Sequence, residues 1–172
     1  MKKYLFLSLM AFATLGTTVS CDRSTEVVQQ TDNDTYPMMR DIRGTFNAAN
    51  QYTISQGINI QTTDVVLVYR NINSGNSNGA VWQLLPKTEY LSNSRELDYN
   101  FLFNTTNLEI YTEANFDQAT MTAAEATTYL NNQQFRVVLV PASQGKNANV
   151  DYRDYNSVIR FYNLDDSHVK GF

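Results

Sequence analysis

The sequence predicts a mainly β protein, an antiparallel β-sandwich with one or two short helices. Eleven Tyr, nine Phe and one Trp lie among many Thr and Val residues, a composition that favours strands. Six or seven short segments have strand-like patterns and are joined by turn-rich connections. Two of these segments are apolar nearly throughout, and two packed antiparallel sheets are the simplest way to cover them. An open sheet backed by the two helices is the alternative.

Residues 1–20 have the three parts of a secretory signal peptide. Lys2 and Lys3 precede an apolar run at 4–13, and small, weakly polar residues fill positions 14–20. The apolar run is about ten residues long, whereas a helix needs about 20 to cross a bilayer. We therefore expect this segment to be removed on export rather than kept as a membrane span.

Cys21, the only cysteine, follows this segment directly. The sequence Thr18-Val19-Ser20-Cys21 resembles the lipobox of bacterial lipoproteins, in which the cysteine is acylated and becomes the first mature residue. Thr18 stands where a lipobox usually has Leu, which leaves cleavage by the ordinary signal peptidase open. A buried thiol is the other interpretation, but the polar residues 22–26 would not enclose one. We therefore expect Cys21 to be the lipid attachment site. Two or three acyl chains on this residue would hold the protein firmly on a membrane.

Residues 21–34 are expected to form the lipidated N-terminus and a flexible tether, because they are polar and lack a sustained apolar period. Within them, Asp22, Arg23 and Glu26 form a candidate sorting signal. Residues 35–172 are expected to form a single β-rich domain, large enough to bury its own core. With one cysteine, an intramolecular disulfide, a thiolate metal cluster and a redox dithiol are excluded.

The charge argues against nucleic acid as a partner. Removal of Lys2 and Lys3 leaves 11 of the 13 basic residues against 17 acidic ones, a formal charge of −6. Affinity for phosphates depends on clustered cations, and here the Lys and Arg residues are scattered.

Strands are predicted in order along the domain. The first half contains candidates at 40–46, at 51–55 with Tyr52 and Ile54 on one face, and at 64–70, which is apolar enough to be central. Residues 71–79 are rich in Asn, Ser and Gly and predict a hairpin loop to a strand at 80–85 that Pro86 closes.

The second half contains another hairpin, a helix, a central strand and a final helix. The hairpin joins 97–103, with Leu97, Tyr99, Phe101 and Phe103 on one face, to 108–111. A capping box of Thr122 and Glu125 predicts a helix at 123–130, and the apolar run 135–141 predicts a central strand. Near the end, Asp154 or Asn156 can cap a helix with an apolar face formed by Tyr155, Val158, Ile159 and Tyr162.

Four of these segments carry a resemblance to a known group of proteins. In order, they are the residues DVVLVY at 64–69, VWQLLP at 81–86, LDYNF at 97–101 and FRVVLVPA at 135–142, followed by the Asp-x-x-x-x-Asn-x-Val-Ile pattern from Asp151 to Ile159. Behind a lipoprotein signal, they resemble small uncharacterised lipoproteins of Bacteroidetes-type bacteria over residues 64–172. The resemblance implies no catalytic residue, since no activity is established for the group.

Some members of that group carry the label dihydrolipoamide dehydrogenase, and several have a collagen-like Gly-Pro stretch after the cysteine. This sequence has neither the Gly-rich dinucleotide-binding turn nor the cysteine pair that such an enzyme needs. It also lacks the collagen-like stretch. We therefore expect no such cofactor chemistry.

Few residues suggest catalysis or metal binding. His168 is the only histidine, which excludes a multi-histidine zinc site and leaves a Ser-His-Asp triad dependent on a residue near the C-terminus. Carboxylate pairs that could hydrolyse a glycosidic bond occur at Asp151 and Asp154, at Asp165 and Asp166, and at Asp32 and Asp34. Each lies in a polar stretch where solvated charge is the ordinary explanation. We expect no catalytic residue, cofactor or metal site.

Two further patterns suggest binding. Asn147, Asn149 and Asp151 place oxygen ligands at alternate positions, but the Gly and terminal Glu of a calcium loop are missing. Trp82, with Tyr69 and Tyr90, could form an aromatic platform for a sugar or peptide, although a tryptophan more often fills the core of a sandwich.

The sequence thus favours a non-catalytic binding or structural module, held by lipid in the cell envelope, at the outer membrane. An envelope protein or a glycan is the expected partner. A small carbohydrate-active hydrolase with paired carboxylates is the alternative.

Overall fold

The computed structural model describes residues 37–74, 79–142 and 150–172. The predicted signal peptide at 1–20, Cys21 with the tether at 21–34, and the residues Asp32, Asp34, Asn147 and Asn149 lie outside these ranges. The described residues belong to one unit of the chain, residues 33–172.

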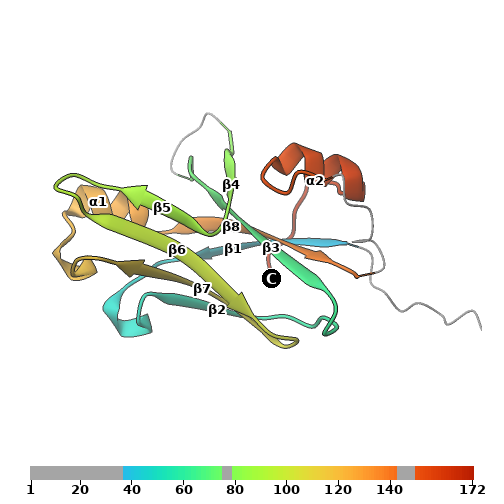
Figure 1. The fold of residues 1–172 in the computed structure, drawn as a ribbon, viewed down its shortest axis with the longest axis horizontal. Coiled ribbons are helices and arrows are strands. Elements are labelled where there is room, and N and C mark those ends of the chain that lie inside the picture. Colours follow the sequence, from blue (N-terminus) through green and yellow to red (C-terminus); the bar gives the residue numbers. More distant parts are fainter. Residues whose placement is uncertain (1–36, 75–78, 143–149) are drawn as a thin grey trace, which may run out of the picture. The chain divides into compact units, whose positions relative to one another are not determined.

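Two antiparallel sheets of four strands confirm the predicted β-sandwich (Figure 1). The first sheet has the order β1 (Met38–Gly44), β8 (Gln133–Val140), β3 (Val65–Asn71) and β4 (Trp82–Leu84). The second sheet has the order β2 (Thr53–Gly57), β7 (Asn107–Ala114), β6 (Glu96–Phe103) and β5 (Lys87–Tyr90). The alternative of a single open sheet is therefore wrong.

Two short helices complete the fold, together with 3₁₀ turns at Ala48–Asn50 and Gln118–Thr120. Helix α1 (Ala123–Tyr129) begins with the predicted capping box, in which Thr122 and Glu125 each bond the other's backbone N–H. Helix α2 (Tyr155–Tyr162) is capped by Asp154, which resolves the choice left open between Asp154 and Asn156.

The main core lies between the sheets, where alternate residues of the strands meet. On β6, Leu97 and Tyr99 are fully buried, whereas Phe103 at the strand's end is 40% exposed. The predicted inward face of this strand is therefore confirmed for its first part only. The largest buried side chains of this core are Phe46, Tyr99, Phe135, Leu97, Leu108 and Ile110.

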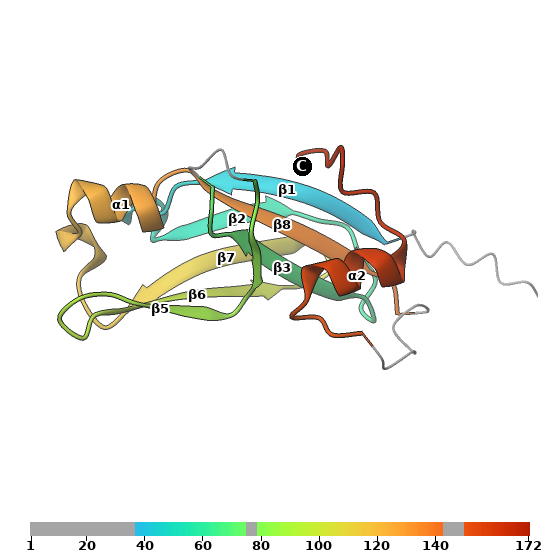
Figure 2. The same cartoon turned by 90° about the horizontal axis from the view of Figure 1, so that it is seen from above.

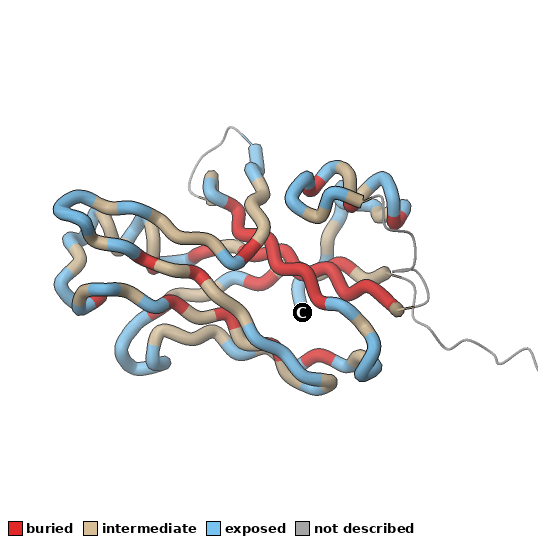
Figure 3. Tube along the Cα trace, in the orientation of Figure 1, coloured by how far each residue is buried: buried red, intermediate tan, exposed pale blue. Residues whose placement is uncertain are grey.

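A second apolar cluster lies on the outer face of the first sheet, between this sheet and α2. Figures 1 and 2 show α2 on this side of the sandwich. Leu67 and Tyr69 of β3 and Val138 of β8 contact the apolar face of α2, including Val158. Both strands are thus covered on both faces, as their uninterrupted apolar sequences predict. Figure 3 shows the result as an almost continuous buried path along β3 and β8.

A charged pair inside the sandwich links the two sheets. Arg70 of β3, only 4% exposed, donates a hydrogen bond of 2.8 Å to Glu89 of β5. Its guanidinium also bonds Gln133 and lies 4.2 Å from the centre of the Tyr99 ring. The β5 strand that supplies Glu89 was not predicted from the sequence.

The chain passes from one sheet to the other at Pro86. Strand β4 ends at Leu84, so the prediction that Pro86 closes this strand is confirmed. The Leu85–Pro86 peptide bond is cis, and β5 begins at Lys87 in the second sheet. Strand β4 at one edge of the first sheet and strand β5 at one edge of the second are therefore consecutive in the chain.

Candidate binding cleft around Trp82

Trp82 lies on the outer face of the first sheet, and neither prediction for it is correct. It is half-buried against the cluster beneath α2 rather than between the sheets. The platform with Tyr69 and Tyr90 does not form, because Tyr69 is fully buried whereas Tyr90 is 76% exposed on β5 of the other sheet. The indole contacts Tyr155 of α2 instead, with ring centres 5.7 Å apart.

Arg136 of β8 lies against the Trp82 ring and is held by neighbours on two other elements. Its guanidinium carbon is 4.3 Å from the centre of the Trp82 ring, within the range of a cation–π contact. Nε and one terminal nitrogen donate to the two carboxylate oxygens of Asp41 on β1, at 2.7 and 2.9 Å. The other terminal nitrogen donates to the Tyr155 hydroxyl at 2.6 Å. The arginine is therefore fixed in position before any ligand arrives.

Burial and hydrogen bonding shift the pKa values of Arg136 and Tyr155. Burial lowers the pKa of Arg136, but the hydrogen bonds to Asp41 and Tyr155 outweigh that effect and raise it overall. Burial raises the pKa of Tyr155 to about 12, against the opposing influence of Arg136. The Tyr155 hydroxyl therefore keeps its proton at neutral pH and can donate it to the Asp166 carboxylate, 3.1 Å away.

These residues border a cleft of about 490 Å³, which we call the Trp82 cleft. Its lining combines the indole, Arg136, Tyr155 and residues at the start of α2 and in the C-terminal segment: Ala80, Val81, Arg153, Asp154, Asn156 and Asp166. Arg136 has five N–H donors, of which three have partners among the described residues. Two donors of a rigidly held cation therefore remain for a ligand.

A second hollow follows the free edge of β4, and we call it the edge groove. It has a volume of about 730 Å³ and shares Val81, Trp82 and Arg153 with the Trp82 cleft. The remainder of its lining comes from β4 and its neighbours: Ile72, Gln83, Leu84, Leu85, Pro86 and Lys87. The single tryptophan of the chain thus borders both hollows.

His168 does not belong to a catalytic triad in this structure. Its Nδ1 lies 2.9 Å from the Ser167 hydroxyl, which in turn bonds the Asp165 carboxylate. In a triad the histidine stands between the hydroxyl and the carboxylate, whereas here the serine does. These hydrogen bonds lower the pKa of Asp165, and all three residues are exposed. We interpret them as a turn.

The described carboxylates of the predicted pairs mostly serve local structure. Asp151 accepts a hydrogen bond from the backbone of Arg153, and Asp165 accepts one from Ser167. Asp154 caps α2. Asp154 and Asp166, one from each of the two pairs within the described residues, both line the Trp82 cleft, a combination that their spacing in the sequence did not indicate.

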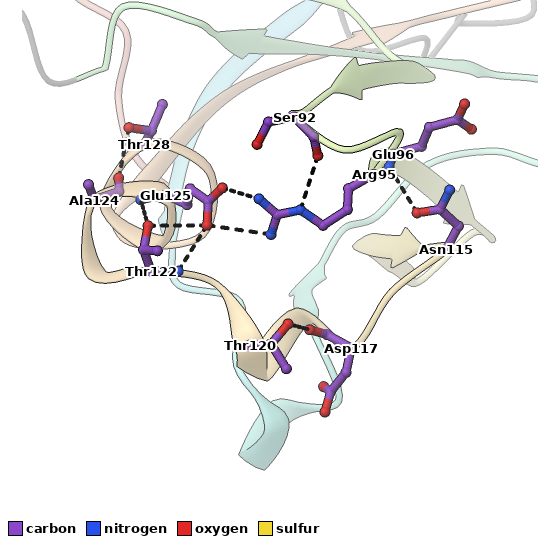
Figure 4. Close-up of polar contacts among 10 residues, drawn as sticks. All are labelled: Ser92, Arg95, Glu96, Asn115, Asp117, Thr120, Thr122, Ala124, Glu125 and Thr128. Carbon is purple, nitrogen blue, oxygen red and sulfur yellow. Dashed lines mark hydrogen bonds and ion pairs between the residues drawn. The ribbon is translucent and has the colours of Figure 1, made fainter.

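A further polar cluster joins α1 to the turn between β5 and β6 (Figure 4). Arg95 forms an ion pair with Glu125, which also accepts a hydrogen bond from the Thr122 backbone at 2.9 Å. The Arg95 hydrogen bond is the main reason why the pKa of Glu125 is lowered. Arg95 and Glu125 thus connect the start of α1 to this turn, and we interpret the cluster as an anchor for the helix.

Arg136 and Tyr155 of the Trp82 cleft were not predicted as site residues from the sequence, although one signal pointed to Arg136. Arg136 interrupts the apolar run FRVVLV, and a charge in a central strand needs a buried partner.

In the part of the chain that the structure describes, no cluster of three metal-ligating side chains occurs, and no helix is both long and apolar enough to cross a membrane.

Comparisons with protein-family models, with curated proteins and with solved structures gave no match. The geometry of the cleft and the N-terminal sequence are therefore the features from which we infer the function.

Proposed function

We propose that this protein is a lipid-anchored lipoprotein of the cell envelope whose folded domain is a non-catalytic binding module. The signal-like residues 1–20 support export, and the lipobox-like position of Cys21 supports the anchor. The outer membrane is the part of the envelope that we propose for it. The partner is an envelope protein or a glycan that enters the Trp82 cleft.

The observation that carries the binding role is the preorganised Arg136. A cation held by Asp41 and Tyr155, stacked on Trp82 and left with two unused donors, loses little freedom when a ligand binds. Preorganisation of this kind improves affinity because less ordering is needed on association. The indole offers an apolar surface beside polar groups that can orient a ligand.

The binding role can be tested with the intrinsic fluorescence of Trp82, because it is the only tryptophan. The lipidated protein in detergent micelles is titrated with soluble peptidoglycan fragments, with outer-membrane oligosaccharides and with short peptides. A saturable shift in emission that Arg136→Met weakens supports the proposal. Lys170→Glu, an exposed substitution beside the opposite edge of the first sheet, is the matched control.

The anchor is tested separately by metabolic labelling with an alkyne fatty acid. Label and membrane retention should both disappear in Cys21→Ala. An unlabelled, soluble wild-type protein would show that Thr18 prevents processing of the lipobox. The proposed anchor would then be wrong, whereas the proposed binding role would still depend on the fluorescence test.

One observation favours a second candidate, a small carbohydrate-active hydrolase. Asp154 and Asp166 line the same cleft, and paired carboxylates are what glycoside hydrolysis needs. Release of reducing ends from envelope polysaccharides, abolished by Asp166→Asn and retained by the neighbouring Asp165→Asn, would support it. No release by the wild-type protein at any pH from about 4 to 8, the usual range for such carboxylates, would remove it.

A further inference from the structure

We propose that the edge groove binds an extended polypeptide with alternating apolar and acidic residues, which adds to the first sheet as a strand beside β4. This inference rests on the proposed binding role and names the class of partner. It follows from the hydrogen-bonding direction of β4, the state of the two sheet edges and the charge of the groove.

Among the described residues, the register of β4 leaves backbone groups without a partner along its outer side. Ile72 donates to the Val81 carbonyl at 2.9 Å, and Leu85 donates to the Val68 carbonyl at 2.9 Å. In an antiparallel ladder the paired residues alternate, so the N–H and C=O groups of Trp82 and Leu84 point away from β3. Two residues thus present two donors and two acceptors to an added strand.

The opposite edge of the same sheet is already occupied. Asp41 of β1 donates to the Lys170 carbonyl at 3.0 Å, and Phe172 donates to the Asp41 carbonyl at 3.3 Å. The C-terminal segment therefore covers β1 as a short parallel bridge. Among the described residues, the β1 edge is thus bridged at Asp41, whereas no strand or bridge pairs with the outer side of β4, which borders the edge groove.

Apolar side chains flank the free backbone on both sides of β4. Trp82 and Leu84 lie on the α2 side, half-buried against the outer cluster. Ile72 and Val81 lie on the other side and are 47% and 45% exposed. An added strand would cover these residues with its own alternate side chains, which is how strand addition acquires specificity.

The charge of the groove selects an acidic partner. Lys87 and Arg153 line it, and among the described residues its lining includes no carboxylate, although the chain as a whole has a formal charge of −4. A second copy of this chain, paired through the same edge, would bring two such cation pairs together within the screening length of about 10 Å. Like charges at that distance disfavour the homodimer and favour a carboxylate-bearing segment.

The test uses the lipidated protein in detergent micelles and a peptide of alternating Val and Glu, about eight residues long, as an ordinary strand is. The peptide has no aromatic residue, so any change in tryptophan emission reports on Trp82, which lines the groove. The same peptide with methylated amide nitrogens keeps its side chains but cannot donate to a strand. A Val–Lys peptide tests the sign of the charge.

The matched variants reverse two cations at each edge of the sheet. Lys87→Glu with Arg153→Glu changes the groove, whereas Arg43→Glu with Lys170→Glu makes the same change in charge at the β1 edge. Arg43 and Lys170 are exposed, so the control leaves the core intact. We expect the groove variant to weaken binding of the Val–Glu peptide about tenfold or more and to gain binding of the Val–Lys peptide. The control variant should bind like the wild type.

Each other outcome overturns the inference in a distinguishable way. Equal binding of the methylated peptide would mean that side chains alone are recognised, and an unchanged affinity in the groove variant would place the peptide elsewhere. If no peptide binds but glycans shift the Trp82 emission, strand addition is wrong while the proposed binding role stands. If neither class of ligand changes the emission, both are wrong. A stable dimer dissolved by the groove variant would identify a second copy as the occupant.

Discussion

Removal of the Asp41 carboxylate should destabilise the domain by far more than loss of a surface ion pair. Asp41 holds Arg136 through two hydrogen bonds, and the two side chains are only 19% and 9% exposed. Exposed pairs contribute about 0–1 kcal/mol, whereas breaking a buried pair costs about 3–5 kcal/mol because the remaining charge is unpaired. Since this pair is mostly buried, we expect Asp41→Ala to lower the free energy of unfolding by about 3 kcal/mol.

The variant should remain folded, because a domain of this size has a stability of about 5–15 kcal/mol. Urea unfolding at neutral pH, followed by the emission of Trp82, measures the change. With a slope near 2 kcal/mol per molar urea, the midpoint should fall by about 1.5 M. The tryptophan is a direct reporter because Arg136 stacks on its ring.

A double-mutant cycle separates the ion pair from the packing of its side chains. Arg136→Met alone leaves the Asp41 carboxylate without its main partner, whereas the double variant removes both charges. Replacement of a buried pair by apolar residues is often neutral or stabilising, so the double variant should be no less stable than Asp41→Ala. Either of two results would refute the assignment of this pair as buried and coupled. In the first, the two single-variant changes in the free energy of unfolding add within about 0.5 kcal/mol in the double variant; in the second, Asp41→Ala lowers that free energy by less than about 1 kcal/mol.

Three further predictions concern single positions. Because the Arg95 hydrogen bond lowers the folded-state pKa of Glu125, its stabilisation is full above about pH 5 and is lost as the pH falls through that pKa. The difference in Tm between wild type and Glu125→Gln should therefore be largest at neutral pH and shrink towards about pH 3; an unchanged difference would contradict it. Gly44→Ala should lower the free energy of unfolding in urea by about 1–3 kcal/mol, because the added Cβ would lie 2.7 Å from Cγ1 of Ile54. Ile54→Val in the same protein should restore part of that loss. Asp154→Ala should lower the free energy of unfolding by about 1 kcal/mol because it removes the cap of α2. Asp154→Asn, which can still cap the helix, should retain most of the wild-type stability in thermal unfolding.

Strands with a strong local signal were predictable from the sequence, and those stabilised by their surroundings were not. Strands β3 and β8 were recognised because their apolar runs need cover on both faces. Strand β5 was missed because Lys87 and Glu89 stand at its inward positions, where a strand usually has apolar residues. Lys87 lines the edge groove, and Glu89 is accommodated by a partner on another strand. That partner, Arg70, is distant in sequence and could not be chosen in advance.

The site escaped prediction for a related reason. Its side chains come from β1, β4, β8 and α2, and their meeting depends on the order β1-β8-β3-β4 in the first sheet. Trp82 could not be placed because its side depends on the register of a strand of only three residues. A shift of one position would move the indole from the outer face to the inner one.

The two buried arginines show why the cleft, rather than the interior, is the place to seek a ligand. Arg70 and Arg136 are 4% and 7% exposed, so burial does not distinguish them. Register places them on opposite faces, since Arg70 pairs with Phe135 of the inner core and Arg136 pairs with Tyr69 of the outer cluster. Arg70 forms four hydrogen bonds to Glu89, Gln133 and the Thr128 carbonyl, which leaves few of its N–H donors for a ligand. Arg136 forms three and borders an open cleft, so its spare donors are the ones that a ligand can reach.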